Sequence, residues 1–171
     1  AFEEASSKYF GQSGPRPTAR EVAEYYRERE MACVIFPVDA EAGTGQRRVP
    51  NEEVAEIAAE YPDVLIPFAS IEPSKGRMGA REARRLILDH GVRGFKFHPN
   101  LQEFFPNDRK AYVLYEVIAE ARLPALFHTG HSGIGTGMPG GGGIRLKYST
   151  PMYVDDVAVD FPEMPIILAH P

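Results

Sequence analysis

Five short apolar runs alternate with amphipathic segments along this chain, and this alternation constrains the fold more than any other feature. The runs are Ala32–Val38, Val64–Ile71, Val92–His98, Pro124–His128 and Pro165–His170. They are too short for buried helices and rich in β-branched and aromatic residues, so they predict strands. Strands separated by helices at roughly thirty to forty residues are typical of βα units that form a parallel sheet. The sequence therefore predicts an α/β fold.

The segments between the runs predict helices, and several carry end signals. Thr18 and Glu21 form a capping box, Asn51 can cap the next helix, and His90-Gly91 can end the third. The expected helices cover about 21–29, 51–60, 79–89, 108–122 and 153–161. The first fifteen residues show no period, so we expect a lead-in segment or loop there.

Two architectures fit this order of elements: a section of a (β/α)8 barrel, or an open doubly wound parallel sheet. The number of strands alone does not choose between them. In both, the working surface lies at the carboxyl ends of the strands, so the residues that end each strand are the informative ones.

Composition excludes several classes of protein. The 171 residues suffice for one domain, and 19 Lys and Arg against 24 Asp and Glu give a net charge of -5, which offers nothing to a nucleic acid backbone. No apolar run approaches the roughly 20 residues that cross a bilayer. Cys33 is the single cysteine, so no internal disulfide forms, and a packing role is expected for it in its strand. We expect a cytoplasmic protein that binds neither nucleic acid nor membrane.

Three successive strands end in histidine: His98, His128 and His170. Side chains alternate along a strand, so Lys96 and His98 share one face while the phenylalanines beside them share the other. The same period allows all three histidines to converge. A single histidine at a strand end is more often a hydrogen-bonded core residue than a ligand, but three at equivalent positions favour a functional site.

Imidazoles at such a site favour a divalent metal, with zinc first and manganese or iron as alternatives. Such a metal activates water or polarises a carbonyl. His170 is suited to accept the proton of the water, because imidazole titrates near neutral pH.

A glycine-rich segment follows the strand that ends at His128, and its sequence allows two interpretations. Residues 131–143 lack the endings of a P-loop or a dinucleotide fingerprint, so they form either a flexible connector or a substrate lid. His131 can face the site or solvent, and Arg145 can pair with an anionic substrate group. Ser132 lacks a nucleophile elbow, which disfavours a serine hydrolase.

The segments Gly94–Pro99, Pro124–Gly130 and Pro165–Pro171 resemble strands of the amidohydrolase-related family. These are metal-dependent (β/α)8 barrels that include aminocarboxymuconate-semialdehyde decarboxylase and resorcylate decarboxylases. The resemblance implies that strands two to six are present, that His128 is a metal ligand, and that His170 holds the metal or its water. It also places Lys96 and His98 where substrate or water is contacted.

The family's first-strand His-x-His pair and eighth-strand aspartate have no counterpart here. We therefore expect residues 1–171 to be one barrel domain that is incomplete at both ends. The resemblance implies a metal-dependent hydrolase acting on a small carbonyl or carboxylate substrate, with Lys96 and His98 as substrate-binding residues. The place of His131 and Arg145 in and just after the glycine-rich segment adds them to the expected substrate-binding residues. The alternatives are a decarboxylase of an aromatic or muconate-type acid and a noncatalytic truncated α/β module. By analogy, a homodimer or higher homo-oligomer is expected.

Overall fold

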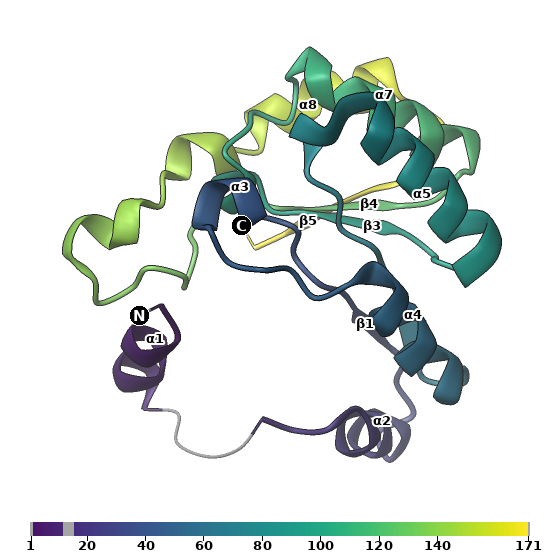
Figure 1. The fold of residues 1–171 in the computed structure, drawn as a ribbon, viewed down its shortest axis with the longest axis vertical. Coiled ribbons are helices and arrows are strands. Elements are labelled where there is room, and N and C mark those ends of the chain that lie inside the picture. The colour runs from purple at the N-terminus through teal and green to yellow at the C-terminus, as the bar shows by residue number, and fades with distance from the viewer. Residues whose placement is uncertain (1, 12–15, 171) are drawn as a thin grey trace.

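The computed structural model describes residues 2–11 and 16–170 and shows a layer of parallel strands with helices packed outside it (Figure 1). The strands are β1 (Cys33–Ile35), β2 (Leu65–Pro67), β3 (Phe95–Phe97), β4 (Ala125–His128) and β5 (Ile166–Ala169). The helices are α1 (Phe2–Phe10), α2 (Ala19–Arg27), α3 (Glu41–Thr44), α4 (Asn51–Glu60), α5 (Gly76–His90), α6 (Pro99–Gln102), α7 (Arg109–Glu120) and α8 (Met152–Asp160). Three 3-10 turns complete the fold: η1 (Pro73–Lys75), η2 (Pro139–Gly143) and η3 (Leu146–Ser149).

The strands follow one another across the sheet in chain order. β1 pairs with β2, β3 with β4 and β4 with β5, all in parallel. An isolated bridge between Ala69 and Phe95 joins the two sheets, and Arg93 N donates to Pro67 O at 2.8 Å. A doubly wound sheet reverses its strand order at a switch point, whereas a barrel does not. The order observed confirms the section of a (β/α)8 barrel and disfavours the open sheet.

The two faces of the sheet differ as the alternation predicts. Phe95, Phe97 and Phe127 point outward into a core shared with α5 and α7, where the rings of Phe97 and Tyr115 meet edge to face at 5.4 Å. Aromatic side chains bury large apolar areas, so this layer supplies much of the stability. Lys96 lies on the opposite face of β3, as expected.

Gly94, just before β3, allows the ring of Phe68 to pack directly against the backbone. A Cβ atom at Gly94 would lie 2.4 Å from the ring of Phe68, which is buried. The aromatic ring therefore occupies the space that any other residue at position 94 would need.

The two outermost strands are more exposed than their apolar sequences suggest. Val34 and Phe36 are 36% and 40% exposed, and Ile167 and Leu168 are 44% and 48% exposed. The expectation of a buried first strand is therefore wrong. Among the described residues, β1 pairs only with β2 and β5 only with β4, so one long edge of each strand has no neighbour. Cys33 is partly buried and packs against the cluster of Ala23, Ala58, Val64 and Leu65.

The helix ends agree with the sequence in two places and differ in a third. The capping box of Thr18 and Glu21 is present, and Gly91 ends α5 in the left-handed conformation with φ of 65°. The expected cap at Asn51 is wrong, because Pro50 occupies the cap position. The side chain of Asn51 instead accepts a hydrogen bond from Ser70 N at 2.8 Å and donates to Ser70 O at 3.0 Å.

The expected lead-in loop is also wrong over residues 2–10, where helix α1 forms with Lys8 in its last turn. Residues 1 and 12–15 of that expectation lie outside the described residues. The helix approaches the glycine-rich segment, since Ala5, Tyr9 and Gly137 line one surface pocket. Within the described part of the chain, no helix combines the length and apolar character needed to cross a membrane.

Candidate active site

The carboxyl ends of β3, β4 and β5 bring the three strand-end histidines together. The rings of His98 and His128 are stacked, with centroids 4.0 Å apart and planes 9° apart. The rings of His128 and His170 lie 5.0 Å apart at 55°. The register of β3 and β4 pairs Phe97 with Phe127, so His98 and His128 follow at equivalent positions and lie side by side. The β5 partner of His128 is Ala169, so His170 lies one position beyond that register and is not at the equivalent position the sequence suggested. The expected convergence is confirmed as geometry.

Lys96 lies on the same face of the sheet as His98 and is only 3% exposed. Its ammonium is 5.3 Å from the centre of the Phe36 ring. Burial lowers the pKa of Lys96 to about 8. Among the residues that the structure describes, no carboxylate pairs with Lys96. A buried cation without such a partner is costly unless something compensates it, so this position suits an anionic group of a ligand.

The environment keeps two of the histidines neutral. Burial, with His128 and Lys96 as further causes, lowers the pKa of His98 to about 3. Burial and the nearby Lys96 lower the pKa of His128 to about 4. Both imidazoles therefore offer unprotonated nitrogen atoms at neutral pH, which is the form that binds metals.

The third histidine is held through its backbone. Thr129 Oγ1 donates to the carbonyl of His170 at 2.7 Å, and Thr129 N donates to Ala169 O at 2.9 Å. His170 adopts a left-handed conformation, with φ of 71°. Such a conformation costs about 1 to 3 kcal/mol in a residue with a side chain, and it is found preferentially at functional sites.

The remaining two predicted site residues lie outside this cluster. The side chain of His131 is exposed, and it is the backbone carbonyl of His131 that reaches His128 Nε2, at 2.8 Å. Arg145 is also exposed and precedes η3. The structure therefore brings Lys96, His98, His128 and His170 together, and leaves the His131 and Arg145 side chains at the surface.

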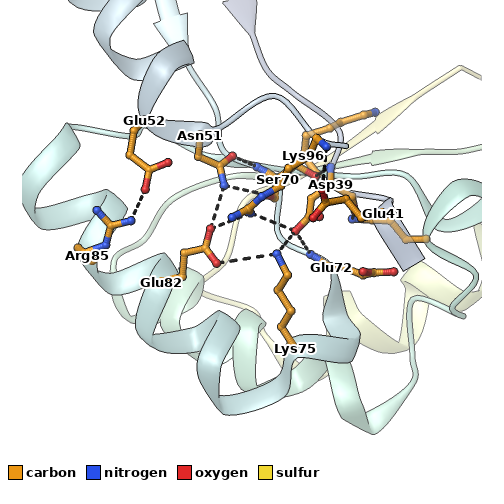
Figure 2. A network of polar contacts seen from close by, with 12 residues as sticks. Asp39, Glu41, Asn51, Glu52, Ser70, Glu72, Lys75, Glu82, Arg85 and Lys96 are labelled. Carbon is orange, nitrogen blue, oxygen red and sulfur yellow. Dashed lines mark hydrogen bonds and ion pairs between the residues drawn. The ribbon is translucent and has the colours of Figure 1, made fainter. Parts of the chain in front are cut away.

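A buried polar network lies beside the cluster, around Asp39 (Figure 2). Asp39 is fully buried, and its Oδ2 accepts hydrogen bonds from Lys75 Nζ at 2.6 Å, Arg48 Nη1 at 3.3 Å and Glu72 N at 3.0 Å. Glu82, on α5, binds Arg48 at 2.9 Å. Burial and the proximity of Asp39 raise the pKa of Glu72.

This network connects the ends of three strands. Asp39 N donates to Ser70 Oγ at 3.1 Å, and Ser70 Oγ donates to Lys96 O at 2.8 Å. Gln102 donates to Asp39 O at 2.8 Å and accepts from His98 N at 2.8 Å. Asp39 directly follows the apolar run Ala32–Val38, and Ser70 lies near the end of the run Val64–Ile71, but nothing in the sequence indicates Gln102. The network fixes the backbone from which Lys96 and His98 project.

Three buried polar atoms have no hydrogen-bond partner among the described residues: Asp39 Oδ1, His98 Nδ1 and Asn100 Oδ1. Buried polar atoms are almost always paired, so each unpaired atom needs an explanation. His98 Nδ1 belongs to the histidine cluster, where a ligand would supply the partner.

Comparison with known proteins agrees with this geometry. A family model described as "Amidohydrolase" matches residues 4–171, which is nearly the whole chain. The protein therefore belongs to the amidohydrolase family. Among curated proteins, none matches the chain significantly.

Solved structures with the same fold include an uncharacterized TIM-barrel protein from Bordetella bronchiseptica, at 22% identity and a TM-score of 0.65. That match covers 96% of this chain and 57% of the other. The manganese-bound 5-carboxyvanillate decarboxylase of Novosphingobium aromaticivorans matches at 19% identity and a TM-score of 0.56, over 70% of this chain and 38% of its own. The 2,6-dihydroxybenzoate decarboxylase from Rhizobium matches at 15% identity and a TM-score of 0.53, over 90% and 46%. The chain thus spans little more than half of the first structure.

Proposed function

We propose that the histidine cluster belongs to a metal-dependent active site that acts on a small carbonyl or carboxylate substrate. The observation that carries this proposal is the convergence of three strand-end histidines and one buried lysine on the inner face of the sheet. Hydrolysis is our first reading of the reaction, in keeping with the family to which the chain belongs.

The donor set fits a divalent metal in part. His128 Nε2 is hydrogen-bonded to a backbone carbonyl, which leaves the lone pair of Nδ1 available for a metal. The ring of His170 lies beside the ring of His128. Among the described residues, however, no group of three or more His, Cys, Asp and Glu side chains can hold a metal ion. We propose that His128 and His170 are two ligands of a larger set, with Zn²⁺ as the first candidate and Mn²⁺ or Fe²⁺ as alternatives.

A metal at these residues would lower the pKa of water and polarise a substrate carbonyl. A His170 that ligates the metal has no lone pair left for a proton, so it would take the proton of an attacking water only if it holds that water instead of the metal. Lys96 would bind a carboxylate of the substrate, and the neutral ring of His98 would donate or accept one hydrogen bond. His131 and Arg145, exposed on the glycine-rich segment, would contact only a substrate that extends beyond the cluster.

Decarboxylation is the second candidate. It is favoured by the similarity to structures of 5-carboxyvanillate and 2,6-dihydroxybenzoate decarboxylases. In this reaction Lys96 and the metal would orient the carboxylate that is lost, and a histidine of the cluster would supply the proton that replaces it.

The two reactions are distinguished by assaying the zinc-loaded and manganese-loaded protein on a β-keto ester and on 2,6-dihydroxybenzoate, with CO2 measured. Hydrolysis predicts ester cleavage that is lost in His170→Gln and weakened mainly in KM by Lys96→Met. His90→Gln, at the distant end of α5, is the matched control. Release of CO2 without ester cleavage would replace hydrolysis by decarboxylation. The absence of both activities in both metal-loaded forms would contradict the proposed function.

A further inference from the structure

The ring of His128 is held at its edge by the chain that follows it. His128 Nε2 lies 2.8 Å from the carbonyl oxygen of His131. A carbonyl only accepts hydrogen bonds, so Nε2 carries the proton and the lone pair is on Nδ1. The carbonyl thus selects one of the two tautomers of a neutral imidazole. Partners of this kind orient histidine ligands in metal sites.

The position of this carbonyl depends on a sharp reversal of the chain at Gly130, whose φ of 72° favours glycine. The reversal is clamped from a distant part of the sequence. Gly130 N donates to Ser149 O at 2.9 Å, and the single proton of Ser149 Oγ is shared between Gly130 O at 2.7 Å and the more distant Leu146 O at 3.0 Å. The bonds between Gly130 and Ser149 close the loop of residues 131–148, which contains the glycine-rich segment, at its base.

The hydroxyl of Ser149 is itself buried and oriented. Ser149 is 1% exposed, and its Oγ accepts a hydrogen bond from Asn100 Nδ2 at 3.0 Å. Asn100 lies on α6, directly after the strand that carries His98. The contacts therefore form a continuous path from α6 through η3 to the turn after β4.

We infer that Ser149 is a positioning residue for His128: its hydroxyl fixes the Gly130 turn, the turn places the His131 carbonyl, and the carbonyl sets the tautomer of the ring. The inference rests on the proposed function, since a set tautomer matters only if His128 binds a metal or substrate. It also gives the glycine-rich segment a role at its base that neither a flexible connector nor a lid requires.

The test uses a pair of substitutions of equal shape, Ser149→Thr, which keeps the hydroxyl, and Ser149→Val, which removes it. Histidine ¹⁵N spectra of the metal-free protein at pH 7 report the tautomer, with the His128 signals assigned from a His128→Gln sample. We expect wild type and Ser149→Thr to show the Nε2–H form and Ser149→Val to show a mixture. Ser149→Ala repeats the test without added volume. Ser132→Ala is the control within the same segment, because among the described residues the Ser132 hydroxyl accepts a hydrogen bond only from the nearby Ile134 N.

In the same samples, Mn²⁺ titration should show about a 10-fold weaker affinity for Ser149→Val than for Ser149→Thr. A folded Ser149→Val and a folded Ser149→Ala that both keep the wild-type tautomer would overturn the inference. Equal changes of the His128 tautomer in Ser149→Thr and Ser149→Val would also overturn it, because the added volume and not the loss of the hydroxyl would then be responsible. The tautomer is measured without metal, so a wild type that binds no Mn²⁺ refutes the proposed function and leaves this test intact.

Discussion

The imidazole ring of His98 lies flat against that of His128, with centroids 4.0 Å apart and an angle of 9° between the planes. Both rings are buried, and both have a pKa lowered by that burial, to about 3 and about 4. Two protonated imidazoles could not be stacked at this distance without strong repulsion. The arrangement therefore requires neutral rings, and several measurable consequences depend on that condition.

The first consequence concerns the stack itself. His98→Phe keeps a flat ring against His128, whereas His98→Ala leaves a cavity. We expect His98→Ala to lower the free energy of unfolding by about 2 to 4 kcal/mol and His98→Phe to lower it by less than about 1.5 kcal/mol. Urea denaturation measures both. Equal losses in the two variants would show that the stack contributes nothing specific.

If His98 also contacts substrate, His98→Phe should keep metal affinity but raise KM. This split separates the stacking role of the ring from the hydrogen-bonding role of its nitrogen atoms. Loss of metal affinity in His98→Phe would contradict the assignment of His98 as a residue that does not bind the metal.

Stability should fall as the pH is lowered from about 6.5 toward 4. In the unfolded chain a histidine has a pKa near 6.5. In the folded protein the pKa of His128 is about 4, so between these values the unfolded state binds more protons and gains free energy relative to the folded state. The slope is at most about 1.4 kcal/mol per pH unit for each such histidine.

Urea denaturation at pH 7, 6 and 5 measures this slope before most carboxylates titrate. His128→Gln should reduce it, whereas His131→Gln, which changes an exposed side chain, should leave it as in wild type. An unchanged slope in His128→Gln would mean that His128 is not held neutral by the fold.

Asp39 should be far more important for stability than an exposed ion pair. Asp39→Ala removes the fully buried carboxylate of the network and leaves Lys75 and Arg48, which are 27% and 23% exposed, with Glu82 as their remaining carboxylate, and we expect a loss of about 3 to 5 kcal/mol. The control is Asp63→Ala, which breaks the surface pair with Arg27 and should cost less than about 1 kcal/mol. Similar losses in the two variants by urea denaturation would refute a supporting role for the buried network.

The order of the elements could be predicted from the sequence because it depends on local patterns. The apolar runs and the capping box at Thr18 report on their own neighbourhoods, and the strand period alone places Lys96 and His98 on one face. The register of β3 and β4 then brings His98 beside His128. His170 lies one position beyond Ala169, the register partner of His128, so its approach to His128 does not follow from the strand pattern alone.

The rest depends on contacts between distant segments. Asn51 looks like a helix cap, but its amide binds Ser70, nineteen residues away. Ser149 meets Gly130 across a segment whose glycines give no periodic signal. The exposure of β1 and β5 depends on which strands lie beside them, which an apolar run does not report. Sequence patterns indicate what a residue can do, and only tertiary structure decides which partner it meets.

The central claim is that His128 and His170 bind a metal together, and calorimetric titration of Mn²⁺ and Zn²⁺ into the metal-free protein tests it most directly. We predict one ion per chain in wild type, affinity at least about 10-fold weaker in each of His128→Ala and His170→Ala, and wild-type affinity in His90→Ala. Absence of binding in wild type, or equal binding in both variants and wild type, would contradict the account.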